Sequence, residues 1–240
     1  RSRLTAKSDA GRASAWRHRM VRSLSRRAFT AAAVLSAVAG FVDGVGFVSL
    51  GGFFVSFMSG NTTRASVGLA GGDLGMAAVG LILILAFVAG VIAGTAMPST
   101  SRGRGETRIL ILVTIFVAVA AGALMIDWPL LSGAAMALSM GAMNTVFARG
   151  GEVAFGLTYM TGALVKVGQG IVTALRGGSR TDWVRHAVLW LAIGTGAAAG
   201  ALAFVAFGAG ALWGLVVAMA TALAIPPVRA WVRVSLLRPR

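Results

Sequence analysis

Residues 76–97 read MAAVGLILILAFVAGVIAGTAM, a run of 22 residues without a charged side chain. A helix that crosses the hydrocarbon core of a bilayer needs about 20 such residues, because each backbone polar group must be paired inside the helix. The remainder of the chain is similar, since 57% of its 240 residues are hydrophobic and only 12% are charged. A water-soluble fold of this size could not bury so large an apolar fraction. The sequence therefore predicts an all-α integral membrane protein.

Eight apolar stretches follow one another along the chain, separated by turn residues or charges. They are residues 29–50, 52–71, 76–97, 108–126, 129–148, 153–175, 186–207 and 210–228. No stretch between them has the composition of a soluble domain. We expect one helical bundle, with a basic cytoplasmic arm at residues 1–28 and a basic cytoplasmic tail at residues 229–240.

The two halves of the bundle match each other at a nearly constant spacing. The matching segments are 40–43 with 141–144, at a spacing of 101, and Met58-Ser59-Gly60 with Met160-Thr161-Gly162 and Arg64 with Lys166, both at 102. A fixed period of this kind indicates an internal repeat. We expect two related membrane repeats, residues 29–126 and 127–228.

The positions of Lys and Arg indicate how many stretches cross the membrane, because cytoplasmic loops are enriched in both. If 52–71 and 153–175 enter the bilayer and return on the same side, 20 of the 22 Lys and Arg residues become cytoplasmic. Eight full crossings would instead place the arginine-containing loop at 98–108 outside. We expect six transmembrane helices and two re-entrant segments in two inverted repeats, in a bacterial inner membrane with both termini cytoplasmic. Two ordinary, glycine-kinked spans are the alternative.

Each expected re-entrant segment carries a small polar cluster near its centre. The first has Ser59 to Thr63, and the second has Thr158 and then Thr161-Gly162. Ser, Thr and Asn are the residue types that cap helix N-termini. We expect a helix break at each cluster, with half-helices at 53–58 and 62–70 in the first segment. Neither half-helix is long enough to cross a core about 30 Å thick.

Two motifs resemble the signature of the YoaK family of small bacterial membrane proteins. They are Gly40-Phe41-Val42-Asp43-Gly44-Val45-Gly46-Phe47 and Phe57-Met58-Ser59-Gly60-Asn61-Thr62, and the resemblance covers about residues 29–228. This chain has Gly44 where the family commonly has Ala, and Ser59 where it commonly has Thr. The function of the family is unknown, so the resemblance implies a fold and a membrane location rather than an activity.

Asp43 is the one acidic residue well inside an expected span. A charged carboxylate at that depth is costly, so it should face the bundle interior and pair with Arg64. Asn144 and Lys166 are the repeat equivalents of these two residues. The pair would serve either as an internal ion pair that joins the first span to the first re-entrant segment, or as part of a transport site.

Two features favour an anionic solute near the midplane. The second half-helix of each re-entrant segment points its N-terminus inward, and Arg64 and Lys166 add positive charge there. We expect a secondary transporter, without a cofactor or a metal and without enzymatic activity. The candidate transport residues are Asp43, Ser59, Gly60, Asn61, Thr62, Arg64, Asn144, Thr161, Gly162 and Lys166.

Three other classes of function compete with transport. A passive channel for a small neutral solute or ion, and a membrane scaffold that transports nothing, both stay open. An intramembrane serine enzyme is disfavoured, because neither His18 nor His186 lies well inside a span where it could act as a base for Ser59.

The net charge of +15 would suggest nucleic acid if the protein were soluble. Because most of the cations flank membrane segments, the partners that we expect are membrane lipid and a small molecule or ion, and not nucleic acid. The Gly-x-x-x-Gly spacings that begin at Gly40, Gly90 and Gly196 allow close helix packing. Whether they also join copies of the chain into a homo-oligomer stays open.

Overall fold

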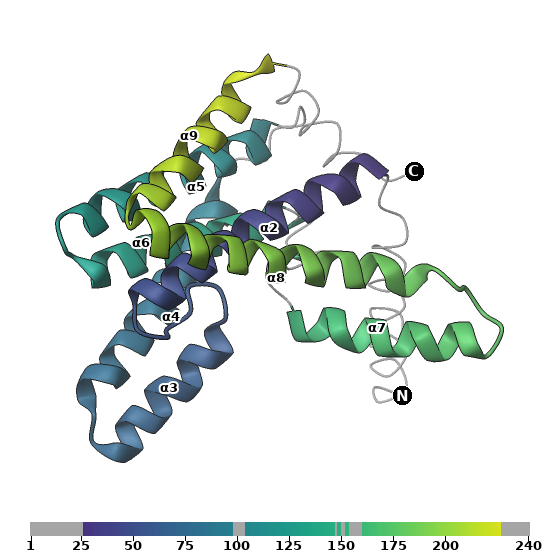
Figure 1. Cartoon of the computed structure of the whole chain (residues 1–240), viewed down its shortest axis with the longest axis horizontal. Helices are drawn as coiled ribbons and strands as arrows, with labels where there is room; N and C mark the ends of the chain where they lie inside the picture. Colours follow the sequence, from purple (N-terminus) through teal and green to yellow (C-terminus); the bar gives the residue numbers. More distant parts are fainter. Residues whose placement is uncertain (1–25, 98–103, 147, 150–151, 154–159, 227–240) are drawn as a thin grey trace, which may run out of the picture.

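The computed structural model describes residues 26–97, 104–146, 148–149, 152–153 and 160–226. In these ranges the chain forms eight α-helices and one two-stranded hairpin (Figure 1). The elements are α2 (Arg26–Ser49), α3 (Met58–Gly71), α4 (Leu74–Ala96), α5 (Arg104–Met125), α6 (Pro129–Asn144), β1 (Ala148–Arg149), β2 (Glu152–Val153), α7 (Met160–Leu175), α8 (Asp182–Phe207) and α9 (Gly210–Ala224). The expected helical bundle is confirmed, and each of the eight apolar stretches overlaps one helix.

Four of these helices are long and apolar enough to cross a membrane: α2, α4, α5 and α8. The helices α6 and α9, which were also expected to span, have 16 and 15 residues. The expected helix at 129–148 is too long, because α6 ends at Asn144 and Ala148–Arg149 pairs with Glu152–Val153 in an antiparallel hairpin. This hairpin was not predicted.

The first expected re-entrant segment is broken at a different place from the one predicted. Residues 50–57 are not helical, and α3 starts at Met58, so the half-helix expected at 53–58 is wrong. The polar cluster at 59–63 lies inside the first turns of α3 instead of before them. Thr62 and Thr63 donate their hydroxyl hydrogens to the carbonyls of Met58 and Ser59, one turn back, so they do not cap the helix.

The turn between α3 and α4 is tight and locally encoded. Gly72 ends α3 with a φ of 77°, a left-handed conformation that favours glycine. The Asp73 carboxylate then accepts a hydrogen bond from the backbone N–H of Met76, at 2.8 Å, and so caps α4. The helices α3 and α4 therefore form an antiparallel hairpin (Figure 1).

The helix α6 forms the centre of the molecule. It packs along α4 and α5 and also touches α2. Its residues Met136, Met140 and Met143 are at most 1% exposed. By contrast, α4 and α8 expose large apolar side chains such as Leu85 and Leu202 on their outer surfaces. Apolar side chains on the outside of an apolar helix contact lipid, as expected for a multi-pass membrane protein.

A very close helix crossing joins α2 to α8 through glycines on both helices. A Cβ on Gly40 would collide with the carbonyl oxygen of Ile193, and a Cβ on Gly196 would collide with that of Ala37. Gly200 meets the carbonyl of Phe41 in the same way. The two backbones are in direct contact, as small-residue spacings allow in membrane helices.

A second crossing, between α4 and α6, is built from glycines in the same manner. Gly141 meets the carbonyl of Phe87, and Gly90 meets that of Leu138. Gly94 lies against the backbone of Ala142. Each crossing therefore joins one helix from the first half of the chain to one from the second half.

Candidate functional site

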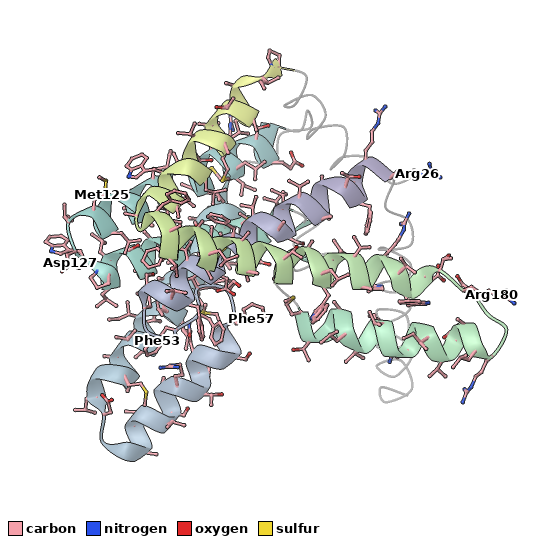
Figure 2. All side chains as sticks on the ribbon, viewed as in Figure 1. Arg26, Phe53, Phe57, Met125, Asp127 and Arg180 are labelled. Atoms are coloured by element: carbon pink, nitrogen blue, oxygen red, sulfur yellow. The ribbon has the colours of Figure 1, made fainter. Side chains whose placement is uncertain are left out.

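The candidate site is the segment 50–57 between α2 and α3, together with the side chains that hold it. Its backbone is not helical, so its N–H and C=O groups lack the regular partners that membrane segments require. Three polar side chains hydrogen-bond to this backbone: Asp43 from α2, and Asn61 and Arg64 from α3. Figure 2 shows Phe53 and Phe57 of the segment at the junction of the two helices.

Asp43 binds the end of the segment nearest α3. Its Oδ1 accepts hydrogen bonds from the backbone N–H groups of Val55, at 2.8 Å, and Ser56, at 3.0 Å. Its Oδ2 accepts a third from the Ser56 hydroxyl, at 2.9 Å. The carboxyl group is buried, with Asp43 only 4% exposed. Gly46, one turn further along α2, leaves room for the Val55 side chain.

Asn61 pairs with the middle of the segment, as a neighbouring strand would. Its Oδ1 accepts from the N–H of Phe54 at 3.0 Å, and its Nδ2 donates to the carbonyl of the same residue at 2.6 Å. Asn61 is fully buried. One amide side chain therefore satisfies both backbone groups of Phe54.

Arg64 binds the end of the segment nearest α2. Its Nη1 donates to the carbonyl of Gly52 at 3.0 Å, and its Nη2 donates to that of Gly51 at 3.3 Å. The guanidinium lies over the Phe53 ring, 4.4 Å from the centroid, in a cation–π contact. Its Nε is buried and has no hydrogen-bond partner among the residues that the structure describes. Gly51 and Gly52 have φ values of 62° and 93°, which turn both carbonyls toward the guanidinium.

The ion pair expected between Asp43 and Arg64 is not formed among the residues that the structure describes. The side-chain hydrogen bonds of Asp43 go to Val55 and Ser56, and those of Arg64 go to Gly51 and Gly52. The reason is the early start of α3, which places Arg64 beside the Gly51–Gly52 turn. The two charged groups hold opposite ends of one segment instead of neutralising each other.

The other predicted residues of the first half lie around the start of α3. Ser59 and Thr62 are exposed, and Gly60 packs against the ring of Phe54. That ring also contacts Phe47 and Phe57, with centroid distances of 5.1 and 5.7 Å. None of these three predicted residues hydrogen-bonds to Asp43 or Arg64 in the described part of the chain.

The predicted residues of the second half lie on α6 and α7. Asn144 is buried at the end of α6, and its Nδ2 donates to the carbonyl of Met140 at 2.9 Å. Thr161 and Gly162 lie in the first turn of α7, and Lys166 Nζ donates to Gln169 Oε1 at 3.4 Å. Thr158 lies outside the described residues. Since α7 packs along α8 and α3 along α4, Lys166 and Arg64 belong to separate helix pairs.

The comparison with known proteins is decisive for family membership. The family described as "Protein of unknown function (DUF1275)" matches residues 31–225. The chain belongs to the DUF1275 family. It is also 37% identical, over 201 residues, to UPF0700 transmembrane protein RA0705 of Rhizobium meliloti (strain 1021), which covers 83% of this chain and 87% of the relative. No solved structure matches.

The DUF1275 match confirms the resemblance to the YoaK family and a multi-pass membrane protein. It extends over nearly all of the helices from α2 to α9, so the segment 50–57 lies within the DUF1275 region. Within the described residues of this DUF1275 chain, no group of three or more His, Cys, Asp or Glu side chains is placed to hold a metal ion.

Sequence reasoning missed three residues of the site in this DUF1275 chain: Ser56, Gly51 and Gly52. Ser56 supplies two of the three hydrogen bonds to Asp43. The signal for the glycines was present, because two adjacent glycines directly after an apolar helix indicate a turn with positive φ. Nothing local to Ser56 indicates that its hydroxyl faces Asp43, because that contact spans 13 residues of the chain.

Proposed function

We propose that the chain is a secondary transporter of a small anionic solute in a bacterial inner membrane, without enzymatic activity. In this proposal α2, α4, α5, α6, α8 and α9 cross the membrane, α3 and α7 are re-entrant, and both termini are cytoplasmic. The two halves are inverted repeats, an architecture found in transporters that bind solute at broken helices near the midplane.

The observation that carries the proposal is the equivalence of the two glycine crossings. The contacts Gly40–Ile193, Gly196–Ala37 and Gly200–Phe41 correspond to Gly141–Phe87, Gly90–Leu138 and Gly94–Ala142. In each contact the α6 residue lies 101 positions after its α2 counterpart, and the α8 residue lies 106 positions after its α4 counterpart. Two interfaces that match residue by residue support a repeat whose halves exchange helices.

The hairpins α3–α4 and α7–α8 match in the same way. Gly68 of α3 lies against Ala77 of α4, and Gly170 of α7 lies against Trp183 of α8. Gly170 lies 102 positions after Gly68, and Trp183 lies 106 positions after Ala77. The difference of four positions is taken up by the longer turn before α8. The matching hairpins support the proposed repeat, in which α3 and α7 occupy equivalent positions.

The distribution of charge along the molecule supports the proposed orientation. Arg26 and Arg180 lie at one end of the molecule, and Asp127 lies at the opposite end (Figure 2). Cations concentrate on the cytoplasmic side of membrane proteins. The end that carries Arg26 and Arg180 is therefore the cytoplasmic end in this proposal.

The anionic class of solute follows from Arg64 and from the start of α3. The first N–H groups of a helix have no carbonyl partner within it, and the N-cap residue Phe57 gives no side-chain hydrogen bond. Arg64, on the second turn, is held by two neutral carbonyls rather than by a carboxylate. Its positive charge is therefore not neutralised by an acidic side chain in the described region.

The test is a flux assay with purified protein in liposomes. The probes are radiolabelled chloride, phosphate and acetate, with glycerol as a neutral probe, each with and without a proton gradient. The proposal predicts saturable uptake of at least one anion that responds to the gradient and falls in R64Q but not in G194A. Uptake that does not saturate and ignores the gradient would indicate a channel, and no flux of any probe would favour a scaffold.

A further inference from the structure

Six of the eight described helices form two groups, and each group mixes the two halves of the chain. Group A contains α2, α7 and α8, and group B contains α3, α4 and α6 (Figure 1). Of the other two helices, α5 packs along α6, and α9 packs along α5 and also touches α8 and α2. Within group A, α8 packs along both α2 and α7, and within group B, α4 packs along both α3 and α6. The chain passes from group A to group B through the segment 50–57.

The contacts within each group are closer than the contact between α2 and α6. Within the groups the crossings bring backbone against backbone, as at Gly40 and Ile193 or at Gly141 and Phe87. Between the groups, α2 and α6 make a smaller contact, and Gly133 of α6 meets the flexible end of the side chain of Leu50, in the segment 50–57. Flexible side chains can repack, whereas two backbones in direct contact leave little freedom to move.

One charged side chain from each group holds the segment 50–57. Each of the two binds the end of the segment that connects to the other group. Asp43 belongs to group A and binds Val55 and Ser56, at the end of the segment that leads into group B. Arg64 belongs to group B and binds Gly51 and Gly52, at the end that leads from group A. Any displacement of one group relative to the other therefore strains both sets of hydrogen bonds.

We propose that groups A and B rock against each other about the segment 50–57, and that Asp43 and Arg64 form a latch that holds the resting arrangement. This inference rests on the inverted-repeat part of the proposed function and is independent of the solute. Rigid-body rocking of mixed helix bundles is how many inverted-repeat transporters alternate access. The latch explains why two charged residues occupy this region without pairing with each other.

The experiment measures distances between spin labels in the full chain, reconstituted in lipid nanodiscs, which the absence of cysteine makes direct. The between-group pair is Leu74→Cys on α4 with Phe207→Cys on α8, two sites that are 70% and 72% exposed. The matched control lies within group A and pairs Leu175→Cys on α7 with Phe207→Cys. Each pair is measured in the otherwise unchanged chain and with R64Q, R64K or G194A added.

The latch predicts that R64Q raises the ratio of displaced to resting between-group distances by about tenfold, because it removes two hydrogen bonds from a charged donor. R64K keeps the charge and one of these bonds, so it should give a smaller shift in the same direction. It replaces R64Q as the test variant if R64Q does not fold. The within-group distance and the G194A background should not change. A between-group distribution that is identical in all backgrounds would overturn the proposal, as would equal broadening of the within-group pair.

Failure of the latch and failure of the transport proposal give different results. A shift in the between-group distances without flux of any probe would support rocking and contradict transport. Flux without a shift would contradict only the latch.

Discussion

Asp43, Asn61 and Arg64 each hydrogen-bond to backbone groups of the segment 50–57 that no helix pairs. A buried backbone group without a hydrogen bond costs several kcal/mol, so these side chains are first of all what makes a buried non-helical segment tolerable. The Asp43 carboxylate accepts hydrogen bonds from N–H groups at one end of the segment, and the Arg64 guanidinium donates to carbonyl groups at the other end. A structural and a functional explanation therefore apply to the same residues.

The Gly51–Gly52 turn allows a prediction with a matched control. G51A should lower the free energy of unfolding by about 1 kcal/mol, since Gly51 has a φ of 62° and open space around it. G52A should cost about 1 kcal/mol more, because its φ is 93° and its Cβ would lie 3.0 Å from Arg64 Nη1. Thermal unfolding of both variants in detergent measures the difference. Equal losses would show that the Arg64 contact does not constrain Gly52.

The helices themselves could be predicted from the sequence, but the position of the break could not. Apolar length located all eight helices, since it reports directly on burial in lipid or protein. The cluster at 59–63 was assigned as a cap because Ser, Thr and Asn favour that position. In the fold, Thr62 and Thr63 bond to carbonyls one turn back, and Asn61 reaches the segment that precedes the helix. The choice between these uses depends on tertiary contacts that local sequence does not contain.

The glycine crossings allow a prediction at the scale of the helix. G196A should lower the free energy of unfolding by about 2 kcal/mol, because the new Cβ would collide with the carbonyl of Ala37. G90A should have a similar effect, because Gly90 is the counterpart of Gly196 in the second crossing and its new Cβ would collide with the carbonyl of Leu138. G194A, on the same helix as Gly196 but with nothing within 4 Å, should leave stability unchanged or slightly raised. Thermal unfolding of the three variants checks this, and a G194A loss as large as that of G196A would count against the packing argument.

At the scale of the whole molecule, the proposed repeat could be predicted from sequence but the exchange of helices could not. Constant spacings of 101 and 102 residues predict related halves. They could not indicate that α2 would pack on α8 and α6 on α4, because both halves carry similar glycine patterns.

The most direct test of the account is the membrane side of two sites, one at the α3–α4 turn and the other at the α7–α8 turn. Leu74→Cys and Leu175→Cys are introduced singly into the cysteine-free chain, where these positions are 70% and 82% exposed. Inverted repeats place position 74 outside the cell and position 175 in the cytoplasm. A membrane-impermeant maleimide added to intact cells should therefore label Leu74→Cys, and should label Leu175→Cys only after the cells are opened. Equal labelling of the two sites in intact cells, or protection of both, would contradict the inverted repeat.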